Sequence, residues 1–226
     1  MSDLLNQYMP NLVYMFPEFL ESIGQTLLMV LVCGFISLVF GILFGLILVV
    51  CREGDILENK IVYTVLGKII DLFRAIPFII LVMILSDVTK LVSGTSIGLR
   101  GSFFPLIVGT IPFFARQIEQ AFAEVDRGLI EASEAMGLTP LQIMFRVYLR
   151  ESIPSIIRAT TITLISLIGL TAIVGAIGGG GVGAFCYNYG YSKMQYDIMW
   201  ACVIALVLIT IIIQGIGNLL ARATTH

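Results

Sequence analysis

The sequence predicts an all-α protein that crosses a membrane several times. Hydrophobic residues make up 58% of its 226 residues and charged residues only 12%, about half the charge content of an ordinary soluble domain. Uncharged runs of 30 residues, between Glu21 and Arg52, and of 34 residues, from Ala159 to Ser192, exceed the roughly 20 residues that a helix needs to cross the hydrocarbon core. We therefore expect a polytopic inner-membrane protein with residues 1–226 in a single domain.

Five transmembrane helices are expected, separated by short polar segments. Their residues are about 22–51, 61–85, 103–120, 155–177 and 199–220. In the first span Ser37, Gly41 and Gly45 recur every four residues, which places small side chains on one helical face. Such a face lets another helix approach closely.

The second span is less regular than the others. Lys68, Asp71 and Arg74 fall in its first half, and Pro77 follows them. Because a proline inside a helix removes a backbone hydrogen bond, we expect a kink there. Asp71 and Arg74 are three residues apart and predict an ion pair near the membrane surface, with a role in gating or transport as the alternative.

Positive residues orient the chain in the membrane. Five spans put the termini on opposite sides, and one side then keeps only Lys90, Arg100 and Lys193. By the positive-inside rule that side is the outer one. The other side carries Arg52, Lys60, Lys68, Arg116, Arg127, Arg146, Arg150, Arg158 and Arg222. The N-terminus is thus predicted outside and the C-terminus in the cytoplasm.

A polar segment between the third and fourth spans, at about residues 126–153, is predicted to be a cytoplasmic helical hairpin. Asp126 can cap a first helix that runs to about Met136, and Gly137 stands where helices commonly end in a left-handed residue. Thr139-Pro140-Leu141-Gln142 has the pattern of a capping box with proline at the first helical position. A second helix would place Leu141, Met144, Phe145 and Tyr148 on one apolar face.

The sequence offers little material for catalysis or metal binding. Its four cysteines are scattered, its one histidine is His226, and no cluster of nucleophiles or bases is evident. Gly178 to Gly183 matches a dinucleotide-binding pattern without the surrounding βαβ unit, so a flexible break in the chain is expected instead. We therefore expect neither an enzyme nor a metal site. Thr163 and Ser166 are candidates for lining a polar substrate path, although such hydroxyls commonly bond to helix carbonyls.

The hairpin also carries a family resemblance. Glu131-Ala132-Ser133, with Gly137 six residues after the glutamate and a close from Val147 to Pro154, resembles the EAA signature of permease subunits of bacterial ABC importers. FRAIPFIIL at 73–81 and GTSIG at 94–98 are similar to the methionine-import branch. Ser133 stands where the family usually has alanine, and Arg150 where it usually has proline.

The resemblance implies a function and a set of partners. It implies a permease that moves L- and/or D-methionine across the inner membrane as a homodimer, with two ATP-binding subunits and an extracytoplasmic binding (lipo)protein, and no nucleic acid partner. It further implies a coupling helix that contacts the ATPase through Glu131, Ala132, Ser133, Glu134, Ala135 and Gly137. The chain lacks the phosphate-loop pattern of ATPases, so ATP and Mg²⁺ would bind the partner ATPase, and this chain would bind no cofactor.

Two alternatives remain open at this point. The chain could belong to an ABC importer of another small amino acid or nutrient. It could also be an ion-coupled secondary transporter, although Asp71 is the only intramembrane carboxylate to support that class.

Overall fold

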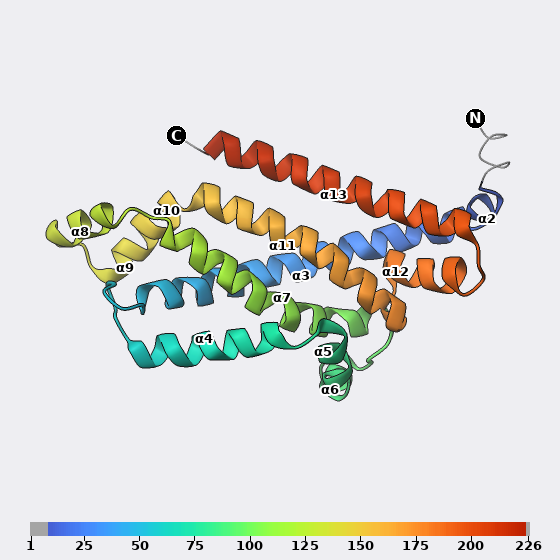
Figure 1. Ribbon diagram of the computed structural model, residues 1–226, viewed down its shortest axis with the longest axis horizontal. Helices are drawn as coiled ribbons and strands as arrows, with labels where there is room; N and C mark the ends of the chain where they lie inside the picture. The colour runs from blue at the N-terminus through green and yellow to red at the C-terminus, as the bar shows by residue number, and fades with distance from the viewer. Residues whose placement is uncertain (1–8, 225–226) are drawn as a thin grey trace. The chain divides into compact units, whose positions relative to one another are not determined.

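The computed structural model describes residues 9–224, and every regular element within that range is helical (Figure 1). The all-α prediction is therefore confirmed, whereas His226 lies outside the described residues. The α-helices are α2 (Pro10–Tyr14), α3 (Phe16–Val50), α4 (Lys60–Ala75), α5 (Phe78–Ile84), α6 (Ser86–Ser93), α7 (Gly98–Ala123), α8 (Arg127–Ala135), α9 (Pro140–Ile143), α10 (Leu149–Glu151), α11 (Ile153–Val174), α12 (Gly181–Phe185) and α13 (Tyr196–Thr224). π-Helical segments cover Met144–Tyr148, Gly175–Gly179 and Cys186–Tyr191.

Four helices in the described range are long and apolar enough to cross a membrane. They are α3, α7, α11 with the π-helical segment that follows it, and α13, and they correspond to the first, third, fourth and fifth predicted spans. Each of the four begins before its predicted residue; α3, for example, begins at Phe16 with Pro17 in its first turn. A proline there loses no helical hydrogen bond, because the first amides of a helix have no partner in any case.

The second predicted span, residues 61–85, is built as two helices. α4 ends at Ala75, Ile76 and Pro77 have extended ψ angles of 124° and 130°, and α5 begins at Phe78. The interruption at Pro77 is thus confirmed as a full break. The 16 residues of α4 reach about 24 Å, less than the hydrocarbon thickness of roughly 30 Å. A count of five spans therefore stays a prediction.

Contacts group the chain into two compact units. The first comprises residues 1–35, 77–108 and 164–213, and the second comprises 36–76, 109–163 and 214–226. Each of the four long helices contributes a stretch to both units. The single-domain prediction for residues 1–226 stays a prediction.

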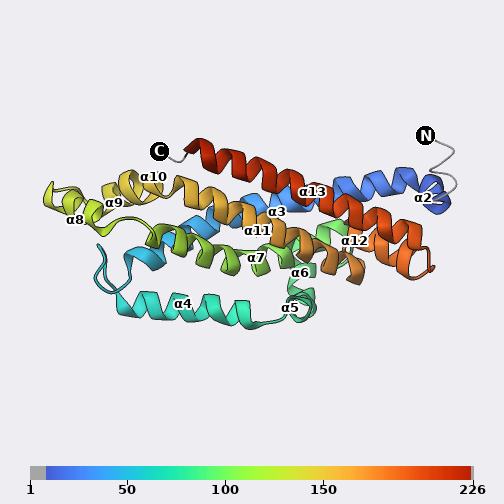
Figure 2. The same cartoon turned by 45° about the horizontal axis from the view of Figure 1, so that its top comes forward.

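In the first unit, the glycine run forms an ordered break between helices. Gly178 and Gly180 have φ angles of +98° and +86°, which glycine adopts without steric cost. The Gly181 amide donates to Gln25 Oε1 at 2.8 Å, and the Val182 amide donates to Thr26 Oγ1 at 2.9 Å. α12 follows directly and packs beside the N-terminal part of α13 (Figure 2). The break is present but ordered rather than flexible, because α3 side chains accept hydrogen bonds from the amides that it frees.

In the second unit, the small residues of α3 form the close-packing face that their spacing predicts. Ser37, Gly41 and Gly45 are all buried. A Cβ atom added at Gly41 would lie 3.0 Å from the ring of Phe114 in α7. One added at Gly45 would lie 2.6 Å from Ile118 Cγ2, so α7 approaches this face too closely for any larger side chain.

We expect Gly45→Ala to destabilise the protein and Gly24→Ala in the same helix to leave it unchanged or stabilise it. Overpacking at Gly45 should cost about 1–3 kcal/mol, because Ile118 and the α7 backbone would have to move. A Cβ atom at Gly24 meets nothing within 4 Å, and removing a helical glycine there should gain roughly 0.5–1 kcal/mol. The midpoints of thermal unfolding, measured in one detergent, would contradict this expectation if both variants shifted equally.

Candidate coupling site

α8 (Arg127–Ala135) begins and ends where the sequence predicts. The Asp126 carboxylate accepts a hydrogen bond from the Gly128 amide at 2.6 Å, as an N-cap residue does. At the other end, the Gly137 amide donates to the Glu134 carbonyl at 2.9 Å, and the Leu138 amide donates to the Ser133 carbonyl at 3.1 Å. With Gly137 at φ +79°, these two bonds form a Schellman motif. The chain therefore reverses immediately after the helix.

The second half of the hairpin is helical but not uniformly α-helical. Pro140 opens α9, and the Thr139 amide donates to Gln142 Oε1 at 2.9 Å, which provides the glutamine half of the predicted capping box. A π-helical turn then covers Met144–Tyr148 and leads into α10. One extra residue is thus wound into the helix that follows Pro140, and the hairpin as a whole stays a prediction.

The predicted apolar face is confirmed for Tyr148 and Met144, which belong to or pack against one core cluster, and is wrong for Leu141 and Phe145. Leu141 and Phe145 are each 64% exposed, whereas Tyr148 is only 1% exposed. The buried pair is instead Ile143 and Tyr148, which are five residues apart and share one core cluster. A spacing of five fits a π-turn, in which each bond spans five residues rather than four. α-Helical periodicity therefore assigned Leu141 and Phe145 to the wrong side.

The buried Tyr148 attaches the hairpin to the loop between α3 and α4. Its hydroxyl donates to the Asp55 carboxylate, 2.8 Å from Oδ1 and 2.7 Å from Oδ2. Its ring packs edge-on against Phe122 of α7, with centroids 6.1 Å apart. Burial raises the pKa of the Tyr148 phenol, and the hydrogen bond to Asp55 raises it further. The hydroxyl thus stays protonated at neutral pH and remains a donor.

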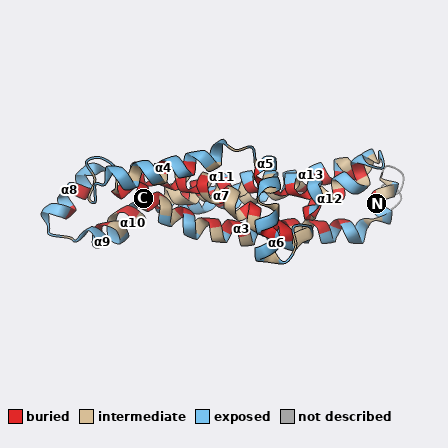
Figure 3. Cartoon of the chain, turned by 90° about the horizontal axis from the view of Figure 1, so that it is seen from below, coloured by how far each residue is buried: buried red, intermediate tan, exposed pale blue. Residues whose placement is uncertain are grey.

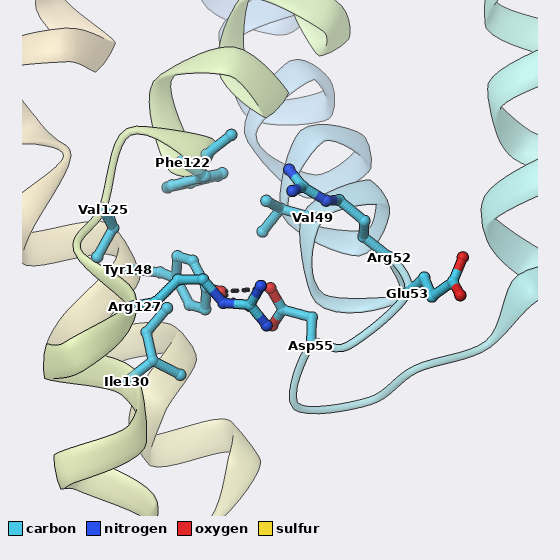
Figure 4. A pocket seen from close by; sticks show the side chains of 10 residues that line it. Val49, Arg52, Glu53, Asp55, Phe122, Val125, Arg127, Ile130 and Tyr148 are labelled. Carbon is cyan, nitrogen blue, oxygen red and sulfur yellow. Dashed lines mark hydrogen bonds between the residues drawn. The ribbon is translucent and has the colours of Figure 1, made fainter.

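A second contact joins the same two segments. Arg127 Nη2 donates to the Gly54 carbonyl at 2.6 Å, at the edge of a pocket of about 50 Å³ that Asp55 and Tyr148 also line (Figure 4). The roles of Arg127, Asp55 and the Tyr148 hydroxyl were not predicted from the sequence. A signal was present, because a buried tyrosine usually needs a partner for its hydroxyl and Asp55 lies in a short loop.

The predicted coupling residues lie on two sides of α8. Glu131, Ala132, Glu134, Ala135 and Gly137 are exposed, as Figure 3 shows for most of α8. Neither side-chain carboxylate forms a hydrogen bond or ion pair with any residue from 9 to 224. Ser133 differs, because it is buried and its hydroxyl donates to the Leu129 carbonyl at 2.7 Å. The outer face of α8 therefore offers two free carboxylates between small side chains.

The two predicted path residues also differ from each other. Thr163 is 1% exposed, and its hydroxyl donates to the Ala159 carbonyl at 2.8 Å. Ser166 is exposed. Only Ser166 thus presents its hydroxyl at the surface of the described chain.

The predicted ion pair between Asp71 and Arg74 is confirmed and has a further member. Arg74 Nη1 lies 3.3 Å from Asp71 Oδ1. Arg116 of α7 also reaches this carboxylate, at 2.8 Å from Oδ2, and donates to the Gly67 carbonyl at 3.1 Å. Arg116 therefore holds α4 against α7, a role that spacing along one helix could not indicate.

We expect Gly137→Ala to destabilise the hairpin more than Gly137→Asn. No atom would obstruct a Cβ at this position, so the difference depends on the backbone alone. A left-handed conformation costs an ordinary residue about 1–2 kcal/mol, and asparagine tolerates it better. Equal midpoints of thermal unfolding for the two variants would contradict this explanation.

Comparison with known proteins places the chain among transport components. Residues 37–226 match the family described as binding-protein-dependent transport system inner membrane component. The probable D-methionine transport system permease protein MetI of Vibrio cholerae is 41% identical over 207 residues, which are 92% of each chain. The methionine import system permease protein MetP of Bacillus subtilis is 40% identical over 176 residues, 78% of this chain and 79% of that protein.

Solved structures agree with these relatives. A structure described as inward-facing conformations of the MetNI methionine ABC transporter matches with a TM-score of 0.92 at 42% identity, over 94% of this chain and 98% of that one. An amino acid ABC transporter solved with histidines matches with a TM-score of 0.79 at 17% identity, over 95% of this chain and 98% of that one, which supports the fold alone. From the family match over residues 37–226 and the relatives that align with most of its length, the chain belongs to the inner-membrane components of binding-protein-dependent transport systems.

Proposed function

We propose that this chain is the permease subunit of an ATP-driven importer that moves L- and/or D-methionine across the bacterial inner membrane. The observation that carries the proposal is the 42% identity to the permease chain of a methionine ABC transporter over 94% of this chain. Similarity at this level along nearly the whole length extends beyond a shared fold. The family assignment also makes the chain a transport component rather than an enzyme.

The working assembly in this proposal has two copies of the chain, two ATP-binding subunits and an extracytoplasmic binding protein. ATP and Mg²⁺ bind the ATPase subunits, and this chain binds no cofactor. Its N-terminus lies outside and its C-terminus in the cytoplasm, so the hairpin faces the ATPase. The distribution of positive residues along the chain supports this orientation.

The outer face of α8 is the surface that meets the ATPase. Glu131 and Glu134 provide carboxylates for charged or amide donors of the partner, and Ala132 and Ala135 let the partner backbone approach closely. Gly137 ends the helix so that the chain turns back at once. Ser133 acts from the inside, because its buried hydroxyl holds α8 in shape.

Movement of α8 passes to the rest of the second unit through two polar contacts. When the ATPase closes on ATP, α8 moves with it, and the bonds from Tyr148 to Asp55 and from Arg127 to Gly54 pull the loop between α3 and α4. Both contacts have short donor–acceptor distances, and Tyr148 is buried. Because the connection is rigid, a displacement of α8 also displaces the loop between α3 and α4. Thr163 and Ser166 of α11 are proposed to lie along the substrate path.

Uptake of radiolabelled methionine into proteoliposomes tests the proposal. The chain would be reconstituted with its ATPase and binding-protein partners, with ATP inside the vesicles. We expect uptake that requires ATP and the binding protein and that unlabelled L- or D-methionine competes away. Competition by a different amino acid but not by methionine would assign another substrate, and uptake driven by an ion gradient without ATP would overturn the mechanism.

A further inference from the structure

A pocket of about 190 Å³ with polar and apolar lining lies between the end of α7 and the beginning of α11, both in the second unit. None of the coupling contacts uses it. α7 contributes Gln117 and Gln120 to its lining, Glu124 follows directly after α7, and α11 contributes Ser155 and Arg158. Its remaining lining is apolar and consists of Ala121, Ala159 and Ile162.

Opposite charges share this pocket without neutralising each other. The Glu124 carboxylate accepts a hydrogen bond from the Ser155 hydroxyl at 2.5 Å. Arg158 is exposed, and its guanidinium forms no ion pair or hydrogen bond with any residue in the range 9–224. A carboxylate and a guanidinium that line one pocket more than 4 Å apart leave room for a ligand that bears both charges.

A zwitterionic amino acid has the chemistry that this pocket complements. Its α-carboxylate suits the forked donors of Arg158, since guanidinium groups bind carboxylates with paired hydrogen bonds. Its α-ammonium suits Glu124 and the amide oxygens of Gln117 and Gln120. An apolar side chain would lie against Ile162 and the two alanines.

The position of the pocket along the chain gives it a place in transport. α7 ends and α11 begins on either side of the hairpin, so the pocket lies on the side of the membrane where the ATPase binds. We propose that Glu124 and Arg158 form a transient exit site, where the zwitterionic substrate is held by both charges before release into the cytoplasm. This inference rests on the proposed function. The exposed position of Arg158 favours weak binding of the substrate, which its release requires.

Binding of three ligands to the purified permease–ATPase complex, without nucleotide, tests the inference. The ligands are methionine, 3-methylthiopropylamine, which lacks the carboxylate, and 4-methylthiobutanoate, which lacks the ammonium. Arg158→Gln should weaken methionine binding ~10-fold or more and leave binding of the amine unchanged. Glu124→Gln keeps an acceptor for Ser155 and should weaken methionine similarly while leaving the butanoate unchanged. Arg150→Gln, which removes an exposed arginine outside the pocket, should change none of the three affinities.

Several results would overturn the exit site, and each is distinct from failure of the proposed function. Equal losses for all three ligands in both variants would assign the two charges a purely structural role. Unchanged methionine binding in both single variants would contradict the exit site and leave the proposed function standing. The same holds if a wild-type complex that transports methionine shows no methionine binding in this assay. A wild-type complex that neither binds nor transports methionine would instead contradict the proposed function.

Discussion

Changing Glu131 to lysine is expected to abolish coupled methionine uptake while the complex still assembles in the membrane. The carboxylate is exposed on α8 and has no partner among residues 9–224, so its replacement disturbs nothing inside the chain. At the ATPase interface that we propose, however, a cation would replace an anion. Losing one member of a buried, hydrogen-bonded charge pair costs about 2–5 kcal/mol, which corresponds to roughly 30-fold to several thousand-fold in an equilibrium constant.

The measurement combines ATP hydrolysis and methionine uptake in the same proteoliposomes. We expect hydrolysis to persist at a basal rate while uptake falls by at least the lower of these factors. Glu151→Lys reverses another exposed charge of the hairpin, outside α8, and should retain uptake. Undiminished uptake by Glu131→Lys would contradict the assignment of α8 as the coupling surface.

Truncating Tyr148 is expected to have the largest effect on stability. Tyr148→Ala removes a ring that is 1% exposed and packed against Phe122, a change that typically costs about 3–5 kcal/mol. Tyr148→Phe keeps the ring and removes only the hydroxyl, which leaves the Asp55 carboxylate without that donor and should cost roughly 1–3 kcal/mol. Phe145→Ala, in the same π-turn but 64% exposed, should shift stability by no more than about 0.5 kcal/mol.

Thermal unfolding of the three variants, in one detergent, checks this order. The pH dependence adds an independent test. Because the folded-state pKa of Tyr148 is raised, its contribution is fully present below the ordinary tyrosine pKa of about 10 and is lost as pH rises toward the folded value. The stability gap between wild type and Tyr148→Phe should therefore narrow above about pH 10. A constant gap across that range would show that the hydroxyl is not the stabilising group.

The sequence predicted those features that depend on local chemistry. The small face of α3 follows from three residues at a spacing of four, and the end of α8 follows from a single glycine in the left-handed region. Both depend on atoms that are close along the chain or on one helical face. The interruption at Pro77 was also predicted, as a kink, because proline lacks the amide that a helix requires.

Features that depend on contacts between distant segments could not be predicted. Asp55 and Tyr148 are 93 residues apart in the sequence, and Asp71 and Arg116 are 45 apart. Composition indicated a continuous second span, although the backbone breaks into α4 and α5. The π-turn is a related case, because α-helical spacing assumes a period that the packing of Tyr148 overrides.

The π-turn at Met144–Tyr148 also constrains how the hairpin could change in evolution. Removing one residue within it would restore regular α-helical winding, and Ile143 and Tyr148 would then stand four residues apart on the same helical face. Regular winding with all five residues kept would instead turn Tyr148 by about 100°, away from Asp55. A relative with a regular α-helix in this segment must therefore have one residue fewer before its hydroxyl donor, or lack the carboxylate in the preceding loop. The length of this segment is thus inherited together with the pair of residues that it aligns.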